Sequence, residues 1–293
     1  MTVFSFQEVY RSYETGVDVL AGVSFQVQAG EVVGLLGRNG AGKTTLIRIA
    51  MGMMQAERGD VRLFGMDPGK DALAIRKRVG YVSEDQVLPA YLKVSDVIAF
   101  HQSLYPTWDR AMAKEMADRF QLPIRSRIRT LSKGQARQVA LLCAVAHKPE
   151  LLILDEPAGG LDPSARREFL ETSINLLNEA GSTILFSSHH MTDVERMANR
   201  IVMLHDGKLL LNSELDHLQE NYALAFIPHG TSVDGLKQLS GCLTVRQRPD
   251  AIHAVFAHPP QQTTALLEEA GYHGARCART TLEELFIELA GGQ

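Results

Sequence analysis

Residues 37–44 have the types and spacing of a phosphate-binding loop. Their sequence, Gly-Arg-Asn-Gly-Ala-Gly-Lys-Thr, fits the pattern G-x-x-x-x-G-K-[ST]. Glycines permit a tight loop whose backbone N–H groups point inward at an anion, and the helix that follows adds positive potential at its N-terminus. Lys43 can reach the β- and γ-phosphates of a nucleotide, and the Thr44 hydroxyl can ligate Mg²⁺. The candidate nucleotide-binding residues of this segment are Gly37, Arg38, Asn39, Gly40, Ala41, Gly42, Lys43, Thr44 and Thr45.

A second chemical feature is the pair of carboxylates that follows the apolar run at residues 151–154. Asp155, at the carboxyl end of a buried strand, would hold Mg²⁺ through water, and Glu156 could orient or activate an attacking water molecule. A strand that ends in acidic turn residues is common, so this pattern alone fits a plain turn equally well. The phosphate loop upstream favours the catalytic interpretation.

Alternating strands and helices are expected to position both features. Residues 32–36 and 151–154 are continuous apolar runs, suited to strands that are buried on both faces of a parallel sheet. The first run leads through the glycine-rich loop into a helix at about 43–51. Helical spacing predicts a mainly helical insert between about residues 88 and 149. The other elements expected here are helices at 94–104, 110–120, 134–147 and 164–179 and strands at 183–186, 201–204 and 208–211.

The two ends of the chain have strand patterns of a different kind. The first 30 residues alternate apolar and polar side chains, which predicts short antiparallel strands, and residues 59–65 are expected to add one more strand to that layer. After about residue 214 the expected order is strand, helix, strand, strand, helix, strand, which is compatible with a small ferredoxin-like βαββαβ unit. Residues 281–290 close the chain as an amphipathic helix.

The composition argues against several other kinds of protein. With 45% hydrophobic and 22% charged residues among 293, the chain is expected to fold rather than to be disordered. The formal net charge of −4 gives no cationic field for nucleic acids, so no nucleic-acid partner is expected. The apolar runs fall far short of the roughly 18 to 20 residues that cross a bilayer. No secretory signal is visible, and the odd number of cysteines suggests reduced thiols, so we expect a cytoplasmic protein.

A run of Leu-Ser-Lys-Gly-Gln at residues 131–135 resembles the LSGGQ signature of the ABC ATPases. Other motifs then match that family in order. Tyr13 resembles the aromatic residue that stacks on adenine, the Gly-Leu-Asp run ending at Asp162 resembles the D-loop, and the Ser-Ser-His run ending at His189 resembles the switch histidine. The resemblance covers about residues 2–213.

The resemblance implies a fold and a domain organisation. Residues 1–213 would form an α/β P-loop NTPase domain of the ABC ATPase type, with a parallel-sheet core, an antiparallel β layer and a helical subdomain at about 86–149. Beyond the resemblance, the strand and helix pattern of residues 214–293 predicts a small α+β C-terminal domain, which would stabilise or regulate the dimer or simply pack against the ATPase. The closing helix resembles that of ATPases from multidrug, antibiotic and sodium exporters.

The resemblance also implies a mechanism and its cofactors, ATP and Mg²⁺. Two such domains would close head to tail around two ATP molecules, so that each site combines the phosphate loop of one subunit with the signature of the other. Lys43, Glu156 and His189 would be the catalytic residues, with His189 holding the γ-phosphate and positioning the water held by Glu156. The residues implied to act across the dimer are Leu131, Ser132, Lys133, Gly134 and Gln135 of the signature, with Asp162 in the D-loop.

One departure from the family pattern affects the metal site. Glu84 stands where a glutamine usually ends the Q-loop. As a carboxylate it can still ligate Mg²⁺, although it places an extra negative charge near the phosphates, and Gln86 is a weaker candidate for the role. The implied metal ligands are Thr44, Glu84 and Asp155.

Other departures lie in the signature and the D-loop. Lys133 replaces the usual middle glycine of the signature, and we expect it to be tolerated because the γ-phosphate is anionic. Arg137 and Gln138 stand where a glutamine and an arginine are commoner, a difference that the sequence does not explain. Gly159 and Gly160 stand where bulkier residues are frequent. None of these changes removes a catalytic group, so an active ATPase is expected.

Two classes of ABC ATPase remain as alternatives, a transporter subunit and a soluble machine acting on ribosomes or DNA. Translation-factor members usually carry two ATPase domains in one chain, whereas this chain has only one set of the motifs. DNA-repair members insert a long coiled coil, whereas the segment between Lys43 and Ser132 is short and has no heptad run. Both features favour a homo- or heterodimeric transporter motor that binds a separate membrane permease on the inner face of the cell membrane. An exporter is favoured and an importer remains the alternative. The transported substrate is not determined by this chain.

Tyr10 and His190 are alternatives to two of the residues that the motifs select, Tyr13 and His189. Tyr10 is the alternative to Tyr13 for the stacking role, and Tyr13 itself could simply pack in its strand. His190, beside His189, is expected to be a polar helix-capping or surface residue rather than a second base, because the motif spacing selects only His189.

Overall fold

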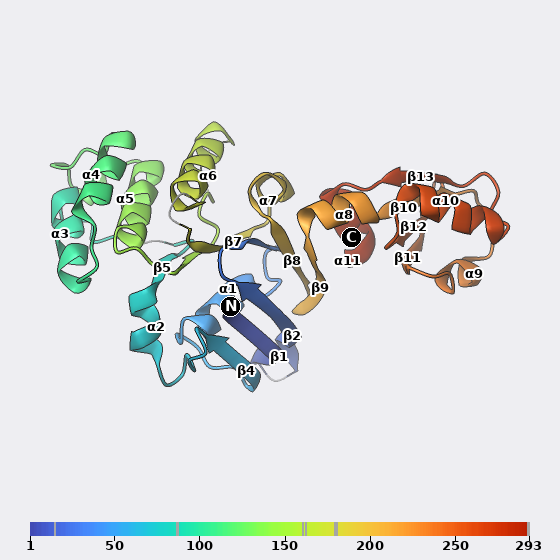
Figure 1. Cartoon of the computed structure of the whole chain (residues 1–293), viewed down its shortest axis with the longest axis horizontal. Coiled ribbons are helices and arrows are strands. Elements are labelled where there is room, and N and C mark those ends of the chain that lie inside the picture. Colours follow the sequence, from blue (N-terminus) through green and yellow to red (C-terminus); the bar gives the residue numbers. More distant parts are fainter. Residues whose placement is uncertain (15, 86–87, 160, 162, 179–180, 292–293) are drawn as a thin grey trace. The chain divides into compact units, whose positions relative to one another are not determined.

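The computed structural model describes residues 1–14, 16–85, 88–159, 161, 163–178 and 181–291 (Figure 1). Contacts within the chain divide it into two compact units, Met1–Asn212 and Ser213–Gln293. In the described part of the chain, no helix combines the length and the apolar character that crossing a membrane requires.

A mostly parallel sheet forms the centre of the first unit. Its strands follow the order β5 (Val79–Val82), β6 (Leu151–Leu154), β7 (Thr183–Ser188), β3 (Val32–Leu36), β8 (Arg200–His205) and β9 (Lys208–Glu214). β3 pairs in parallel with β7 and β8, and β6 pairs in parallel with β5 and β7. Every residue of β3, β6 and β7 is buried, which agrees with the apolar runs in their sequences and confirms the predicted parallel core.

An antiparallel sheet, of order β2 (Val17–Gln28), β1 (Thr2–Glu14) and β4 (Arg58–Leu63), shares a core with α1 (Lys43–Ala50). The rings of Phe4 and Phe6 lie 4.4 Å apart between centroids, and they belong to one apolar cluster with Leu46 of α1 and Leu35 of β3. α1 is therefore anchored to both sheets. This packing fixes the loop that enters the helix.

The short strands expected at the N-terminus are in fact two long ones. β1 continues to Glu14, and β2 runs unbroken through Gly22. Register shifts in their pairing, one of them beside Glu8 with φ of 48°, let the ribbon bend without ending it. The expectation of separate strands was wrong because a bulge interrupts the alternation of side chains without interrupting the ladder. The extended β1 carries Tyr13 toward α1.

The helical insert contains α3 (Val94–Leu104), α4 (Arg110–Arg119), the 3₁₀ turn η1 (Ile128–Thr130) and α5 (Lys133–Val145). α3, α4 and α5 lie side by side in Figure 1, and α5 contacts the other two. α5 also contacts β5 and α6 (Pro163–Asn178), and its residues 139–145 are all buried. The helix that begins in the signature motif is therefore packed directly against the central sheet.

Besides η1, three short elements of the first unit were not expected. They are β5, α2 (Ala72–Arg78) and α7 (Met191–Met197). Among the described residues of the two helices, only Ile75 and Val194 are buried, and a single buried residue gives no 3.6-residue apolar period. α7 packs closely on β3, since a Cβ on Gly34 would lie 2.5 Å from Cγ1 of Val194.

The second unit contains the predicted βαββαβ arrangement, preceded by an unexpected short helix, α8 (Leu215–Asn221). Its antiparallel sheet has the order β11-β12-β10-β13, the strand order of a ferredoxin-like unit. The elements are β10 (Ala223–Ile227), α9 (Val233–Lys237), β11 (Cys242–Gln247), β12 (Ile252–Phe256), α10 (Pro260–Glu269), β13 (Arg276–Arg279) and α11 (Leu282–Ala290). Leu236 of α9 and Leu267 of α10 join the core on one face of the sheet.

α11 is held against this sheet by a buried charge cluster. Glu288 of α11 is buried, and its Oε1 lies 3.0 Å from Nδ1 of His253 in β12 and 3.3 Å from the guanidinium of Arg248. His253 alternates with core residues Ile252 and Ala254, so it projects from the face opposite α9 and α10. Helices therefore cover both faces of the small sheet.

Candidate functional site

The phosphate loop lies between β3 and α1, as the sequence predicts. Gly40 and Gly42 have φ angles of 85° and 101°, in the left-handed region that glycine adopts without strain. A Cβ on Gly42 would lie 2.7 Å from the carbonyl oxygen of Val19, so β2 passes too close to admit a side chain. The backbone can therefore turn sharply into α1, whose N-terminal N–H groups and positive potential suit a phosphate.

Lys43 is the first residue of α1, and only 5% of it is exposed. Its Nζ donates to the carbonyl oxygens of Gly37 at 2.7 Å and Arg38 at 3.3 Å. The same nitrogen lies 3.1 Å from Oε1 of Glu156. The ammonium group is thus placed between the phosphate loop and the acidic end of β6.

Asp155 and Thr44 meet where β6 ends beside α1. Thr44 Oγ1 donates to Asp155 Oδ1 at 3.3 Å, and Ser187 Oγ of β7 donates to the same oxygen at 2.7 Å. Asp155 is 1% exposed, and this burial raises the pKa of its carboxyl, while the hydrogen bonds from Ser187 and Thr44 oppose the rise. A hydroxyl and a carboxylate are the hard oxygen donors that Mg²⁺ prefers, so this donor set fits the ion.

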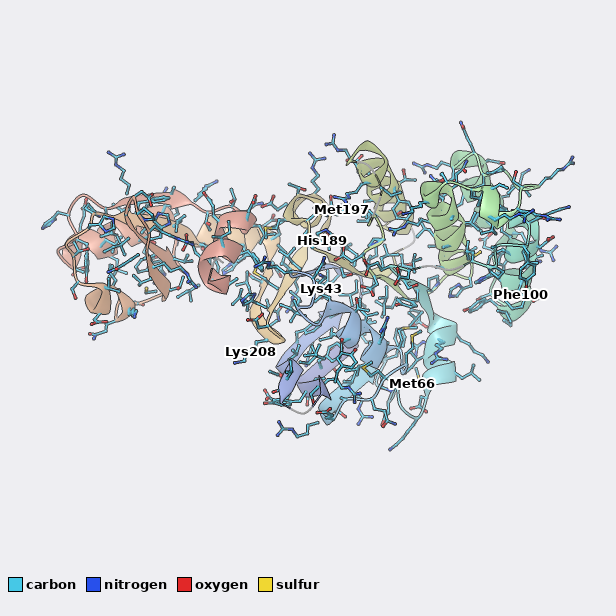
Figure 2. All side chains as sticks on the ribbon, turned by 180° about the vertical axis from the view of Figure 1, so that it is seen from behind. Lys43, Met66, Phe100, His189, Met197 and Lys208 are labelled. Atoms are coloured by element: carbon cyan, nitrogen blue, oxygen red, sulfur yellow. The ribbon has the colours of Figure 1, made fainter. Side chains whose placement is uncertain are left out.

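Glu156 connects the other two predicted catalytic side chains. Its Oε2 lies 2.9 Å from Nδ1 of His189, and its Oε1 faces Lys43. The residue has φ of 45°, which is uncommon without a glycine, and its N–H donates to Ser187 Oγ at 2.8 Å. Lys43 and His189, both labelled in Figure 2, therefore meet at one carboxylate, in an arrangement suited to accepting a proton beside a phosphate.

Sequence reasoning gave Ser187 no role, although it donates to Asp155 and accepts from Glu156. Its position depends on β7 being the neighbour of β6, which no local pattern shows. The only sequence feature that pointed to Ser187 was its place in the Ser-Ser-His run that ends at His189.

A cavity of about 590 Å³ opens beside the phosphate loop. Its size is in the range of ordinary ligand pockets, about 300 to 1,000 Å³. His189 lies on this cavity together with the loop residues. The complete lining is Arg38, Asn39, Gly40, Ala41, His189, His205 and Asp206.

Tyr13 lies near the end of β1, beside the phosphate-loop helix. It is 55% exposed, and its hydroxyl lies 3.1 Å from Oγ1 of Thr45 in α1. Tyr10 is engaged elsewhere, because the guanidinium of Arg58 stands 4.1 Å from its ring centroid and its hydroxyl donates to Glu8 at 3.3 Å. This geometry favours Tyr13 over Tyr10 for the predicted stacking role.

The signature residues surround the start of α5. Ser132 is the N-cap of the helix, where its Oγ accepts the Gln135 N–H at 3.1 Å and its own N–H donates to Gln135 Oε1 at 3.1 Å. Ser132 and Lys133 are exposed, and Leu131, Gly134 and Gln135 are partly exposed. The motif is thus accessible to a second molecule, and its action across a dimer stays a prediction.

Glu84, the third predicted metal ligand, lies in the loop after β5. Its side chain is exposed, and its main-chain carbonyl accepts a hydrogen bond from Arg137 at 3.2 Å. Within the residues that the structure describes, no three acidic, histidine or cysteine side chains are arranged to hold a metal, so Glu84 does not join Asp155 and Glu156 in such a group. Asp162 and Gly160 of the D-loop, and Gln86, lie outside the described residues.

His190 is the N-cap residue of α7, but its side chain makes no capping hydrogen bond. Its ring centroid lies 4.0 Å from that of His189. Burial lowers the pKa of His190, and the neighbouring His189 and Arg166 lower it further, while Asp193 and Glu156 oppose the shift. The neutral imidazole of His190 is therefore favoured beside His189.

The chain is similar to known proteins over most of its length. A family model described as ABC transporter matches residues 20–159. The ABC transporter ATP-binding protein YtrB of Bacillus subtilis is 32% identical over 278 residues, which cover 95% of this chain and 95% of that protein. The linearmycin resistance ATP-binding protein LnrL of the same organism is 30% identical over 292 residues, covering 93% of this chain and 94% of its own length. Both similarities therefore include most of the C-terminal unit.

The structural comparison agrees with the sequence relatives. A solved ATP-binding subunit of an ABC transporter matches this chain with a TM-score of 0.66 and 30% sequence identity. The match covers 74% of this chain and 92% of the other. The expected α/β fold of the ABC ATPase type is confirmed.

Proposed function

Since the chain belongs to the ABC transporter family, as an ATP-binding subunit that hydrolyses ATP, we propose that it is the motor of an exporter whose membrane permease is a separate protein. Export is supported by the similarity to LnrL, a protein named for linearmycin resistance, over 93% of the chain. In this proposal the subunit lies on the inner face of the cell membrane, where the permease binds it. An importer and a soluble ABC ATPase are the alternatives.

The observation that carries the chemistry is the continuous contact from Lys43 through Glu156 to His189. Glu156 would accept the proton of the attacking water, and His189 would hold the γ-phosphate and orient that water. Lys43 would stabilise the negative charge of the β- and γ-phosphates. Mg²⁺, when bound, would neutralise charge on the phosphate oxygens, and Thr44 and Asp155 are the residues that fit it best.

ATP binding is proposed to close two ATPase subunits head to tail, as homo- or heterodimer. Each ATP would be held between the phosphate loop of one subunit and the exposed signature of the other, with Asp162 contributing from the D-loop. Hydrolysis removes the charge that bridges the two subunits, so the pair can open and drive the permease. The C-terminal unit, residues 214–293, is proposed to stabilise or regulate the pair.

Replacing Ser132 with arginine should block closure of the dimer while sparing ATP binding by the monomer. The larger cation would occupy the surface that meets the second subunit, whereas the phosphate loop of the same chain is unchanged. Nucleotide affinity, ATP-dependent dimerisation by light scattering and ATPase rate are the measurements. Ser103→Arg, at an exposed position of α3, adds the same charge elsewhere. This variant should leave the nucleotide affinity, the ATP-dependent dimerisation and the ATPase rate unchanged. Unchanged hydrolysis in Ser132→Arg would refute a role for Ser132 across the interface.

Replacing Tyr13 with alanine should raise the KM for ATP about tenfold, with little change in kcat. Stacking on a base is worth about 1 to 3 kcal/mol, and about 1.4 kcal/mol corresponds to a tenfold change in affinity. Tyr13→Trp keeps an aromatic face and should keep the KM near its original value. Steady-state kinetics with ATP as the varied substrate tests both. If Tyr10→Ala raised the KM and Tyr13→Ala did not, the stacking role would belong to Tyr10.

The transporter assignment is tested by finding the partner of the chain. Tagged Glu156→Gln protein, purified with ATP from detergent-solubilised native membranes, should bring down a stoichiometric polytopic membrane protein that mass spectrometry identifies. The topology of that protein would then distinguish an exporter from an importer. Recovery of ribosomal proteins or DNA-repair factors with no membrane partner would support a soluble ABC ATPase instead.

A further inference from the structure

Arg137 lies one turn into α5, the helix that begins in the signature motif. Its Nη1 donates to the carbonyl oxygen of Glu156 at 3.0 Å and also to that of Pro157. Its Nη2 donates to the carbonyl oxygen of Glu84 at 3.2 Å. One guanidinium group therefore joins the signature helix to the turn after β6 and to the loop after β5.

The turn that Arg137 contacts contains the proposed catalytic base. Glu156 has φ of 45°, and a non-glycine residue in this left-handed region is strained unless its surroundings hold it there. Its carbonyl oxygen accepts from the Gly159 N–H at 3.0 Å as well as from Arg137. The carbonyl and the side chain belong to the same residue. A group that fixes the orientation of the carbonyl therefore also constrains the position of the Glu156 side chain.

Gly159 lies beside both the Glu156 carbonyl and the Arg137 guanidinium group. A Cβ at that position would lie 3.3 Å from the Glu156 carbonyl oxygen and 3.7 Å from Nη2 of Arg137. The first separation is tighter than ordinary van der Waals contact and the second is an ordinary one, so a side chain here would press on the carbonyl oxygen that accepts from Arg137. An arginine at 137 and a glycine at 159, each a departure from the family pattern, therefore meet at the same carbonyl oxygen.

The chemistry of arginine suits this position better than that of other polar residues. Its planar fork holds several N–H donors in fixed directions, so one side chain can reach carbonyl groups of separate segments. Burial lowers the pKa of Arg137, and the negative charges of Glu84, Asp85 and Glu156 oppose that shift. The side chain stays protonated, since arginine does not deprotonate in proteins.

We propose that Arg137 is a positioning residue for hydrolysis, which holds Glu156 in the conformation that presents its carboxylate to the attacking water. The inference rests on the proposed role of Glu156 as general base. It also makes α5 part of the catalytic apparatus, because a displacement of this helix would move the carbonyl of Glu156. Arg137 itself need not touch ATP.

Arg137→Gln should lower kcat by about ten- to a hundredfold, because small displacements of a reacting group carry losses of that order. The KM for ATP should change by less than about twofold, since Lys43 and the loop backbone are untouched. Arg137→Lys keeps the charge, but an ammonium group cannot span the three carbonyls, so it should recover only part of the rate. Arg129→Gln, an exposed arginine eight residues earlier in the chain, is the matched control and should behave like the original protein.

A double-mutant cycle separates positioning from an independent effect. If Arg137 acts through Glu156, Arg137→Gln should leave the residual rate of Glu156→Gln unchanged within about twofold, since the base is already lost. Two results would overturn the inference. One is that Arg137→Gln lowers kcat as much in the Glu156→Gln background as in the original protein, and the other is that Arg137→Gln alone leaves kcat unchanged. If Arg137→Gln does not fold, as judged by circular dichroism, Arg137→Lys can replace it in the same double-mutant cycle.

The two proposals can fail separately. Normal turnover in Glu156→Gln alone would overturn the role of Glu156, and with it the role of Arg137. A slow Glu156→Gln with an additive effect of Arg137→Gln would overturn only the positioning role.

Discussion

Replacing Lys43 with alanine is expected to lower ATP hydrolysis by about two to three orders of magnitude and to weaken nucleotide binding. Lys43 is buried where the phosphate loop meets Glu156, and its Nζ lies 3.1 Å from that carboxylate. Removing a charged donor aimed at developing negative charge costs about two to three orders of magnitude in rate. The measurements are phosphate release at saturating ATP and the affinity for a fluorescent ATP analogue.

The Lys43 variant needs a stability control, because the substitution also removes the cation from a buried pair. Breaking such a pair leaves an uncompensated charge and is typically destabilising by several kcal/mol. Thermal unfolding of Lys43→Ala and of Lys43→Met should therefore be followed along with activity, at temperatures where both are folded. Lys70→Ala removes an 83% exposed lysine far from the loop in sequence and should keep normal turnover. Near-normal turnover in folded Lys43→Ala would contradict the phosphate-loop assignment.

The fold was predictable wherever one segment carries its own signal. The all-apolar runs of β3 and β6 indicate a sheet covered on both faces, and the order of elements after Glu214 indicates the small βαββαβ unit. The order of strands in the large sheet was not predictable, because it depends on which distant segments pair. β3, for example, lies between β7 and β8, more than a hundred residues further along the chain.

The same distinction applies to the site. Lys43, Asp155 and Glu156 belong to contiguous motifs, so residue type and spacing were enough to predict them. Arg137 was noticed as a departure but not explained, because its partners are main-chain carbonyls 19, 20 and 53 residues away. Every residue has a carbonyl, so a contact of this kind leaves no pattern of residue types in the sequence.

The geometry of the site also limits which side chain can act as the base. Asp155 Oδ1 accepts from both Thr44 and Ser187, so that oxygen is committed to hydrogen bonds within the protein. The Glu156 carboxylate instead faces a cation on one side and the imidazole of His189 on the other. Both flanking groups belong to the predicted phosphate-contacting set, so we propose this carboxylate, rather than that of Asp155, as the base.

Replacing Glu156 with glutamine is therefore expected to lower turnover by about two orders of magnitude or more, the usual effect of losing a general base. The amide has nearly the same shape as the carboxylate but cannot accept the proton. ATP binding should survive, because the phosphate loop and Thr44 are unchanged. With hydrolysis blocked, ATP-bound dimers should accumulate, and light scattering should detect them only when ATP is present.

Glu150→Gln is the matched control, since Glu150 precedes the same strand, β6, at its opposite end. There its exposed carboxylate pairs with Arg78, and removing such a surface pair usually changes stability by no more than about 1 kcal/mol. Its turnover should stay normal, so a slow Glu156→Gln would reflect the base rather than a disturbed strand. A Glu156→Gln protein that turns over normally would require a different base. A Glu156→Gln protein that binds ATP but never dimerises would instead contradict the head-to-tail sandwich. In that case the unhydrolysed ATP, whose charge should bridge two subunits, would be bound without joining them.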